Sequence, residues 1–152
     1  MSPRRTRIEK VVTLREKELD KRVQQLAGTR AAEARALSAE EQKKLDLEKA
    51  SETRLKLAEE GDALSANNWI EANEWLANRR LHLEKARVDA ERAQVETRKA
   101  QGAVLVARTD LKKVELLSER IQKQEDTTAQ RVERRLEDEL SSLRFRRTEA
   151  DK

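Results

Sequence analysis

The sequence predicts an all-α fold in which two long helices form an antiparallel coiled-coil hairpin, a single domain over residues 1–152. Charged residues make up 42% of the chain and aromatic residues 2%, and the commonest residue types favour helices. The charged, helix-favouring sequence breaks clearly at Gly61-Asp62. After this break, apolar residues recur every seven positions, which is the repeat of a coiled coil.

The first helix is expected over about residues 4–60. Pro3 fits the first turn of a helix, where its missing N–H costs nothing. The residues expected to face the second helix are Ile8, Val12, Leu19 and Leu26, with Val23 and Leu37 on an adjoining row. Beyond Leu37 the spacing shifts, and a weaker stripe continues at Leu45, Leu55 and Leu57.

The turn is expected over about residues 61–66 and the second helix over about residues 67–148. One row of this helix consists of Trp69, Leu76, Leu83, Ala90, Thr97, Val104 and Leu111. The row three residues further on consists of Ala72, Arg79, Ala86, Ala93, Ala100, Ala107, Val114 and Ile121. These are the a and d rows of a left-handed coiled coil. The predicted structural core is Trp69, Leu76, Leu83, Val104 and Leu111.

The second helix is longer than the first and is expected to overhang at the end that carries both termini. Pairing outward from the turn places Ile8 near Ile121, so residues from about 122 to 148 form a single projecting helix. This overhang keeps an apolar stripe, which needs a partner to leave water. Basic residues cluster at the same end in both helices. The predicted binding surface consists of Arg4, Arg5, Arg7, Val132, Leu136, Leu140, Leu143 and Phe145.

The two tryptophans follow the break closely and differ in their heptad position. Trp69 lies on the a row and is expected to close the end of the hairpin against Leu57. Trp75 flanks the a row, with Arg79 and His82 four and seven residues later. An aromatic ring beside a cationic side chain is typical of interface hot spots, which predicts a second binding surface at Trp75, Arg79 and His82. The alternative is that Trp75 packs over the interface between the helices.

The composition argues against an enzyme, a cofactor site and a metal site. The chain has no Cys and one His, and no Gly-rich loop that could hold a phosphate. No run of about 18 apolar residues is present, which predicts that the chain does not span a membrane. The basic N-terminus is followed by no apolar segment of the kind found in secretory signals. Absence of Cys also suits a reducing compartment.

The segment Ser65-Ala66-Asn67-Asn68-Trp69-Ile70, followed by Trp75, resembles the FliJ family of flagellar and related type III export machines, which includes the YscO-like proteins of injectisomes. The resemblance implies a cytoplasmic stalk, peripheral to the inner-membrane export apparatus and monomeric when free. Its terminal end would insert into the hexameric export ATPase, and its tip would contact the membrane export gate protein through Trp75. Arg79 and His82 match neighbouring positions but not residue types. Export chaperones are further possible partners.

Two other functions fit the sequence less well. A homodimeric coiled-coil scaffold would also use the heptad repeat. A nucleic-acid-binding helical protein would use the basic termini. Acidic residues interleave with these basic residues, the net charge is only +4, and no recognition motif is present, so no nucleic-acid partner is expected.

Overall fold

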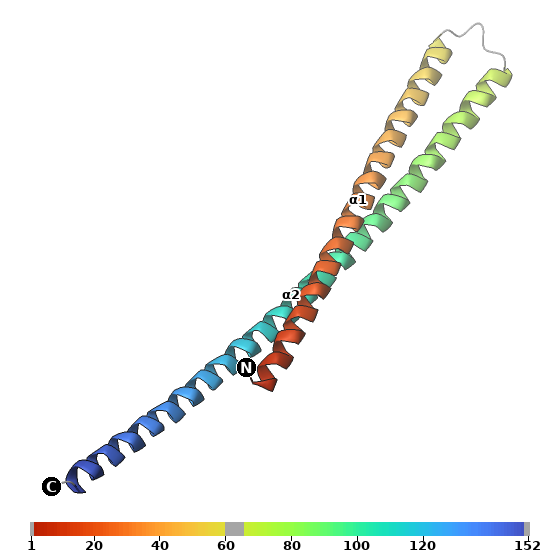
Figure 1. Ribbon diagram of the computed structural model, residues 1–152. Coiled ribbons are helices and arrows are strands. Elements are labelled where there is room, and N and C mark those ends of the chain that lie inside the picture. Colours follow the sequence, from red (N-terminus) through yellow and green to blue (C-terminus); the bar gives the residue numbers. More distant parts are fainter. Residues whose placement is uncertain (1, 60–65, 151–152) are drawn as a thin grey trace. The chain divides into compact units, whose positions relative to one another are not determined.

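The computed structural model describes residues 2–59 and 66–150, which form two long α-helices (Figure 1). Helix α1 spans Pro3–Glu59 and contains 57 residues, and helix α2 spans Ala66–Ala150 and contains 85 residues. The predicted all-α hairpin with a longer second helix is therefore confirmed. The turn was predicted at residues 61–66. Of these, residues 61–65 lie outside the described residues and Ala66 is the first residue of α2.

Helix α1 begins with a capped first turn. The backbone N–H of Arg5 donates to Ser2 Oγ at 3.2 Å, and the backbone N–H of Thr6 donates to the Ser2 carbonyl at 3.2 Å. Ser2 is therefore the N-cap residue, which satisfies an amide that has no partner within the helix. Pro3 occupies the first helical position, as its fixed φ favours.

The chain divides into two compact units, each of which contains part of α1 and part of α2. One unit consists of Met1–Leu19 and Ala107–Lys152, and the other of Asp20–Val106. The expectation of one domain over the whole chain stays a prediction.

The unit Asp20–Val106 has antiparallel helices. Glu40 lies 3.8 Å from Arg87, Asp46 lies 4.0 Å from Arg79, and Arg54 lies over the Trp69 ring. As the residue number increases along α1, the number of the α2 residue in contact with it decreases, so the two helices are antiparallel. In the unit Met1–Leu19 with Ala107–Lys152, Ser2 at the start of α1 donates a hydrogen bond to Glu125, late in α2.

The contact face of α2 follows the predicted heptad rows. Leu76, Leu83, Ala90, Thr97 and Val104 of the a row are buried, and Leu111 is half-buried. On the d row, Ala107 and Ile121 are buried, and the remaining members are half-buried. Thr97 is the polar member of this face, and its hydroxyl donates to the Ala93 carbonyl at 3.1 Å. The a and d rows are confirmed from Ala72 to Ile121.

The contact face of α1 differs from the prediction. Val23, Leu37, Leu45 and Leu55 are exposed, so the predicted adjoining row and the predicted change of spacing are wrong. The heptad phase of Val12, Leu19 and Leu26 instead continues unbroken at the half-buried residues Glu33, Glu40, Leu47 and Arg54. The second contact row consists of Ile8, Arg15, Arg22, Thr29, Ala36, Lys43, Ala50 and Leu57, of which Arg22 is exposed. Many of these positions are occupied by charged or small residues, so the heptad repeat of α1 cannot be recognised from the spacing of its apolar residues.

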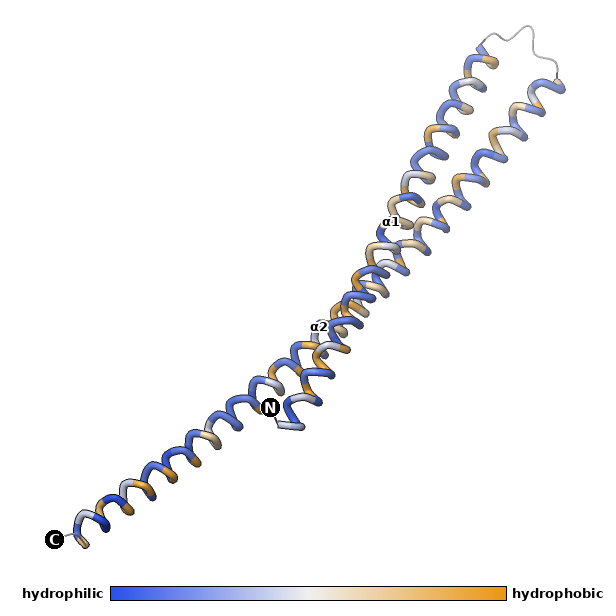
Figure 2. Tube along the Cα trace, viewed as in Figure 1, coloured by the Kyte–Doolittle hydropathy of each residue, from blue (hydrophilic) through white to orange (hydrophobic). Residues whose placement is uncertain are grey.

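The last part of α2 is exposed to solvent. Every side chain from residue 126 to residue 150 is exposed, although these residues are helical. In Figure 1, this part of α2 continues past the start of α1, as the sequence predicted. Apolar positions recur along it among polar ones (Figure 2).

Candidate interaction surfaces on the two helices

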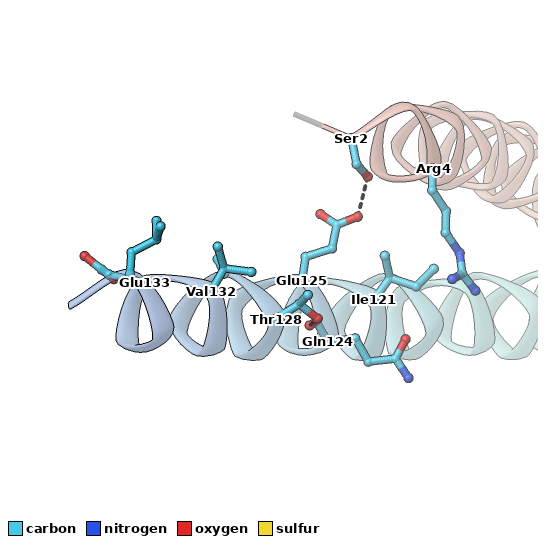
Figure 3. A pocket seen from close by; sticks show the side chains of 10 residues that line it. Ser2, Arg4, Ile121, Gln124, Glu125, Thr128, Val132 and Glu133 are labelled. Carbon is cyan, nitrogen blue, oxygen red and sulfur yellow. Dashed lines mark hydrogen bonds between the residues drawn. The ribbon is translucent and has the colours of Figure 1, made fainter. Parts of the chain in front are cut away.

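We call the binding surface predicted at the overhang the terminal surface; its residues are Arg4, Arg5, Arg7, Val132, Leu136, Leu140, Leu143 and Phe145. It begins at a groove between the start of α1 and the overhanging part of α2. The groove has a volume of about 790 Å³. Residues of α2 line most of the groove, among them Ile121, Ala129, Val132 and Leu136. Ser2 and Arg4 extend from α1 toward this part of α2 (Figure 3). Ile121 is the last buried residue of the interface between the helices. The apolar residues of the lining therefore continue this interface along α2 past the start of α1.

The predicted stripe of the overhang is solvent-exposed along its length. Val132, Leu136, Leu140 and Leu143 keep between 51% and 60% of their surface accessible. Phe145 is still more exposed, at 65%. The spacings of four, four and three residues place the first four side chains along one side of the helix. Phe145 lies two residues after Leu143 and therefore points away from this row.

The three predicted arginines of α1 have different surroundings. Arg4 lines the groove, whereas Arg5 is half-buried and its Nε lies 3.1 Å from Glu9 Oε1 in a pair within α1. Arg7 is exposed. The structure therefore brings Arg4 together with Val132 and Leu136 at one groove, while Arg5 has an acidic neighbour on its own helix.

The tip surface contains Trp75 and Arg79 in direct contact. The guanidinium carbon of Arg79 lies 5.4 Å from the centroid of the Trp75 ring, which is the geometry of a cation–π contact. Arg79 Nη1 also lies 4.0 Å from Oδ2 of Asp46 on α1. Trp75 remains 41% exposed. The ring is therefore held beside the interface and still presents much of its surface to solvent.

Trp69 departs from its predicted role as an enclosed core residue. It is 38% exposed, nearly as much as Trp75. Arg54 of α1 occupies the facing contact position, and its guanidinium carbon lies 4.9 Å from the Trp69 ring centroid. A cationic group that keeps its own hydration covers part of the ring, where an apolar partner would have enclosed it. The predicted contrast between a buried Trp69 and an exposed Trp75 is therefore wrong.

His82 belongs to a different part of the surface from the Trp75–Arg79 pair. Its side chain is exposed and lines a shallow hollow with residues of both helices. The other residues of this hollow are Arg35, Ala36, Ala39, Lys43, Lys85, Ala86 and Asp89. The structure therefore brings two of the three predicted tip residues together and places the third one turn further along α2.

Four residues that shape these surfaces were not predicted from the sequence. Ser2 and Glu125 connect the helices at the groove, and Asp46 and Arg54 support the two tryptophans. Three of them are charged residues in a chain with many charges, so no local pattern distinguishes them. Ser2 before Pro3 had a usable signal, because a serine followed by proline is typical of a helix start.

Within residues 2–59 and 66–150, no group of three or more His, Asp or Glu side chains is arranged to hold a metal ion. Over the same residues, neither helix contains a segment long and apolar enough to cross a membrane.

Comparison with known proteins identifies the family. The family model described as the flagellar FliJ protein matches residues 4–150, which is nearly the whole chain. No curated protein and no solved structure matches the chain. The chain therefore belongs to the FliJ family, whose members are non-enzymatic stalk components that associate with the ATPase complex of flagellar and type III export.

Proposed function

We propose that this protein couples the hexameric export ATPase to the membrane export gate, using the terminal surface for the ATPase and the tip surface for the gate. It acts at the cytoplasmic side of the export apparatus as a monomeric hairpin. Export chaperones are additional candidate partners. The observation that carries the proposal is the overhang, whose exposed apolar stripe extends an interface that α1 no longer covers.

The terminal surface has the composition of a protein-binding face. Four aliphatic side chains on one helix side supply apolar area, and Arg144, Arg146 and Arg147 border its far end. A ring-shaped partner with acidic loops would match both features, because it would cover the stripe and neutralise the arginines.

The tip surface supports a second, smaller contact. Trp75 offers a large rigid ring with few rotatable bonds, and Arg79 restrains it. Aromatic and arginine side chains contribute a large share of the binding energy in many interfaces. This surface is proposed to contact the gate protein.

The double substitution Leu136→Gln with Leu140→Gln tests the terminal surface. Both side chains are exposed in the free protein, so helix content and the unfolding temperature are expected to stay nearly unchanged. Affinity for the ATPase is expected to fall at least tenfold. Each leucine is about half exposed in the free protein, so covering the rest of both side chains contributes about 1.5–3 kcal/mol in total. Leu116→Gln with Leu117→Gln is the matched control, because these α2 residues are also exposed but precede the overhang. ATPase binding that is equally unaffected in both double variants would reject the proposal.

Trp75→Ala tests the tip surface. It is expected to weaken binding to the gate protein, measured by titration with the purified gate domain, without a loss of several kcal/mol of stability. A large loss of stability would mean that the ring is packing and not a contact surface.

A further inference from the structure

We propose that Asp46 on α1 is a positioning residue for Trp75 on α2, acting through Arg79 to hold the exposed indole ring in the orientation that a partner meets. This inference rests on the proposed role of the tip surface. It adds an α1 residue to a surface that the sequence predicted from α2 alone.

The Asp46 carboxylate has one hydrogen-bond donor at Oδ1 and two basic groups at ion-pair distance from Oδ2. Gln42 Nε2 donates a hydrogen bond to Oδ1 at 3.1 Å, and Lys43 Nζ lies 4.0 Å from Oδ2. Arg79 Nη1 approaches the same Oδ2 from α2, also at 4.0 Å. The Asp46 and Arg79 side chains are only 26% and 33% exposed. The Arg79 guanidinium therefore lies at ion-pair distance from a half-buried carboxylate that residues of α1 also contact.

Arg79 carries this restraint to the aromatic ring. A guanidinium is planar and cationic, so it can face a ring and direct an N–H group at a carboxylate at the same time. Its central carbon lies 5.4 Å from the Trp75 centroid. The connected residues are thus Gln42, Asp46, Arg79 and Trp75, and they link the surface of α1 to the exposed indole.

Restraint of the ring matters for binding because an interface side chain loses rotamer freedom when a partner immobilises it. A ring that is already held in place loses less rotamer freedom when the partner binds. Removing the Asp46 charge leaves Trp75 present and exposed but frees Arg79 to move. The expected consequence is a more mobile ring and a weaker contact with the partner, while the helices remain paired.

The Asp46–Arg79 pair also connects the two helices. Its effect on the orientation of Trp75 therefore has to be separated from any effect on the pairing of the helices. The chain offers a matched comparison in Glu40 and Arg87. This pair also links α1 to α2, at 3.8 Å, and Glu40 is half-buried like Asp46, with 17% of its side chain exposed. Its contacts with basic groups are to Lys44 and Arg87, and neither of these lies over a tryptophan ring.

The experiment compares Asp46→Asn with Glu40→Gln in full-length protein that carries Trp69→Phe, so that Trp75 is the one fluorophore. Acrylamide quenching and fluorescence anisotropy report the accessibility and mobility of the ring, and circular dichroism reports helix content. Asp46→Asn is expected to raise the quenching constant and lower the anisotropy, whereas Glu40→Gln leaves both unchanged. In protein with both tryptophans, Asp46→Asn is expected to weaken gate binding about threefold, the scale of one exposed cation–π contact. Equal fluorescence changes in both variants would overturn the inference.

The charge exchange Asp46→Arg with Arg79→Asp separates the two roles further. It restores an ion pair between the helices but removes the cation from position 79, next to Trp75 in α2. Positioning predicts that the ring stays mobile in this variant, and recovery of the wild-type quenching and anisotropy would overturn the inference. If Asp46→Asn frees the ring but Trp75→Ala leaves gate binding unchanged, the proposed tip function fails while the positioning contact stands.

Discussion

Leu83→Ala tests whether the a row of α2 holds the two helices together. Leu83 is 5% exposed, so nearly all of its side chain is removed from water. The substitution deletes three carbon atoms, and at about 0.8 kcal/mol for each buried methylene this costs about 2.4 kcal/mol. Alanine recovers a few tenths of a kcal/mol through its higher helix propensity. A two-helix interface can close around the gap, so the cavity adds little. The expected net loss is about 2 kcal/mol.

The control for this prediction lies two residues earlier on the same helix. Leu81 is 67% exposed, and Leu81→Ala is expected to change stability by less than about 0.5 kcal/mol. Both variants are compared with the wild type by urea unfolding followed through the helical circular dichroism signal. Equal losses in the two variants, or a larger loss for Leu81→Ala, would refute the assignment of the contact face.

Two further predictions follow from the helices. Gly28→Ala is expected to stabilise α1 by about 0.5–1 kcal/mol, because a Cβ at this helical position meets no atom within 4 Å; a lowered unfolding temperature would contradict this. The free protein is expected to sediment as a monomer in dilute solution. Within one chain, α1 already covers the contact rows of α2 from Ala72 to Ile121, so only the stripe of the overhang is left to pair with a second copy. A stable dimer would favour the alternative of a homodimeric scaffold.

The contact face of α2 was readable from the sequence because its buried positions carry apolar residues or alanine. Large residues dominate one row and small ones the other, so the seven-residue repeat is visible without knowledge of α1. The heptad phase of α2 also predicted that Arg79 lies at the interface between the helices. What the repeat could not supply was the partner of Arg79, because Asp46 is far away in the sequence and looks like an ordinary surface acid.

The contact face of α1 could not be read in the same way. Glu33, Glu40, Lys43 and Arg54 occupy interface positions, and an apolar search passes over them in favour of the exposed Val23 and Leu37. Glu40 and Arg54 lie at the interface because α2 offers Arg87 and Trp69 there. Charged contact positions such as these can be recognised only when the sequence of the partner helix is aligned with them. The apolar contact positions of α2 can be recognised from the sequence of α2 alone.

These charged contacts also select the register of the helices in the unit Asp20–Val106. Alanines at many contact positions interlock weakly, so a slip of one heptad would cost little apolar packing. The same slip breaks at least one ion pair between the helices. A slip in one direction sets Ala39 opposite Arg79 in place of Asp46. A slip in the other direction sets Thr53 opposite Arg79. It also sets Leu47 opposite Arg87 in place of Glu40. Either slip leaves the half-buried Arg79 without its carboxylate, whereas the exposed Arg87 keeps Glu84 of its own helix. Fixing register is the best-attested use of polar groups in coiled coils. Since the Asp46–Arg79 contact also holds Trp75, the correct register and the presentation of the ring depend on one interaction.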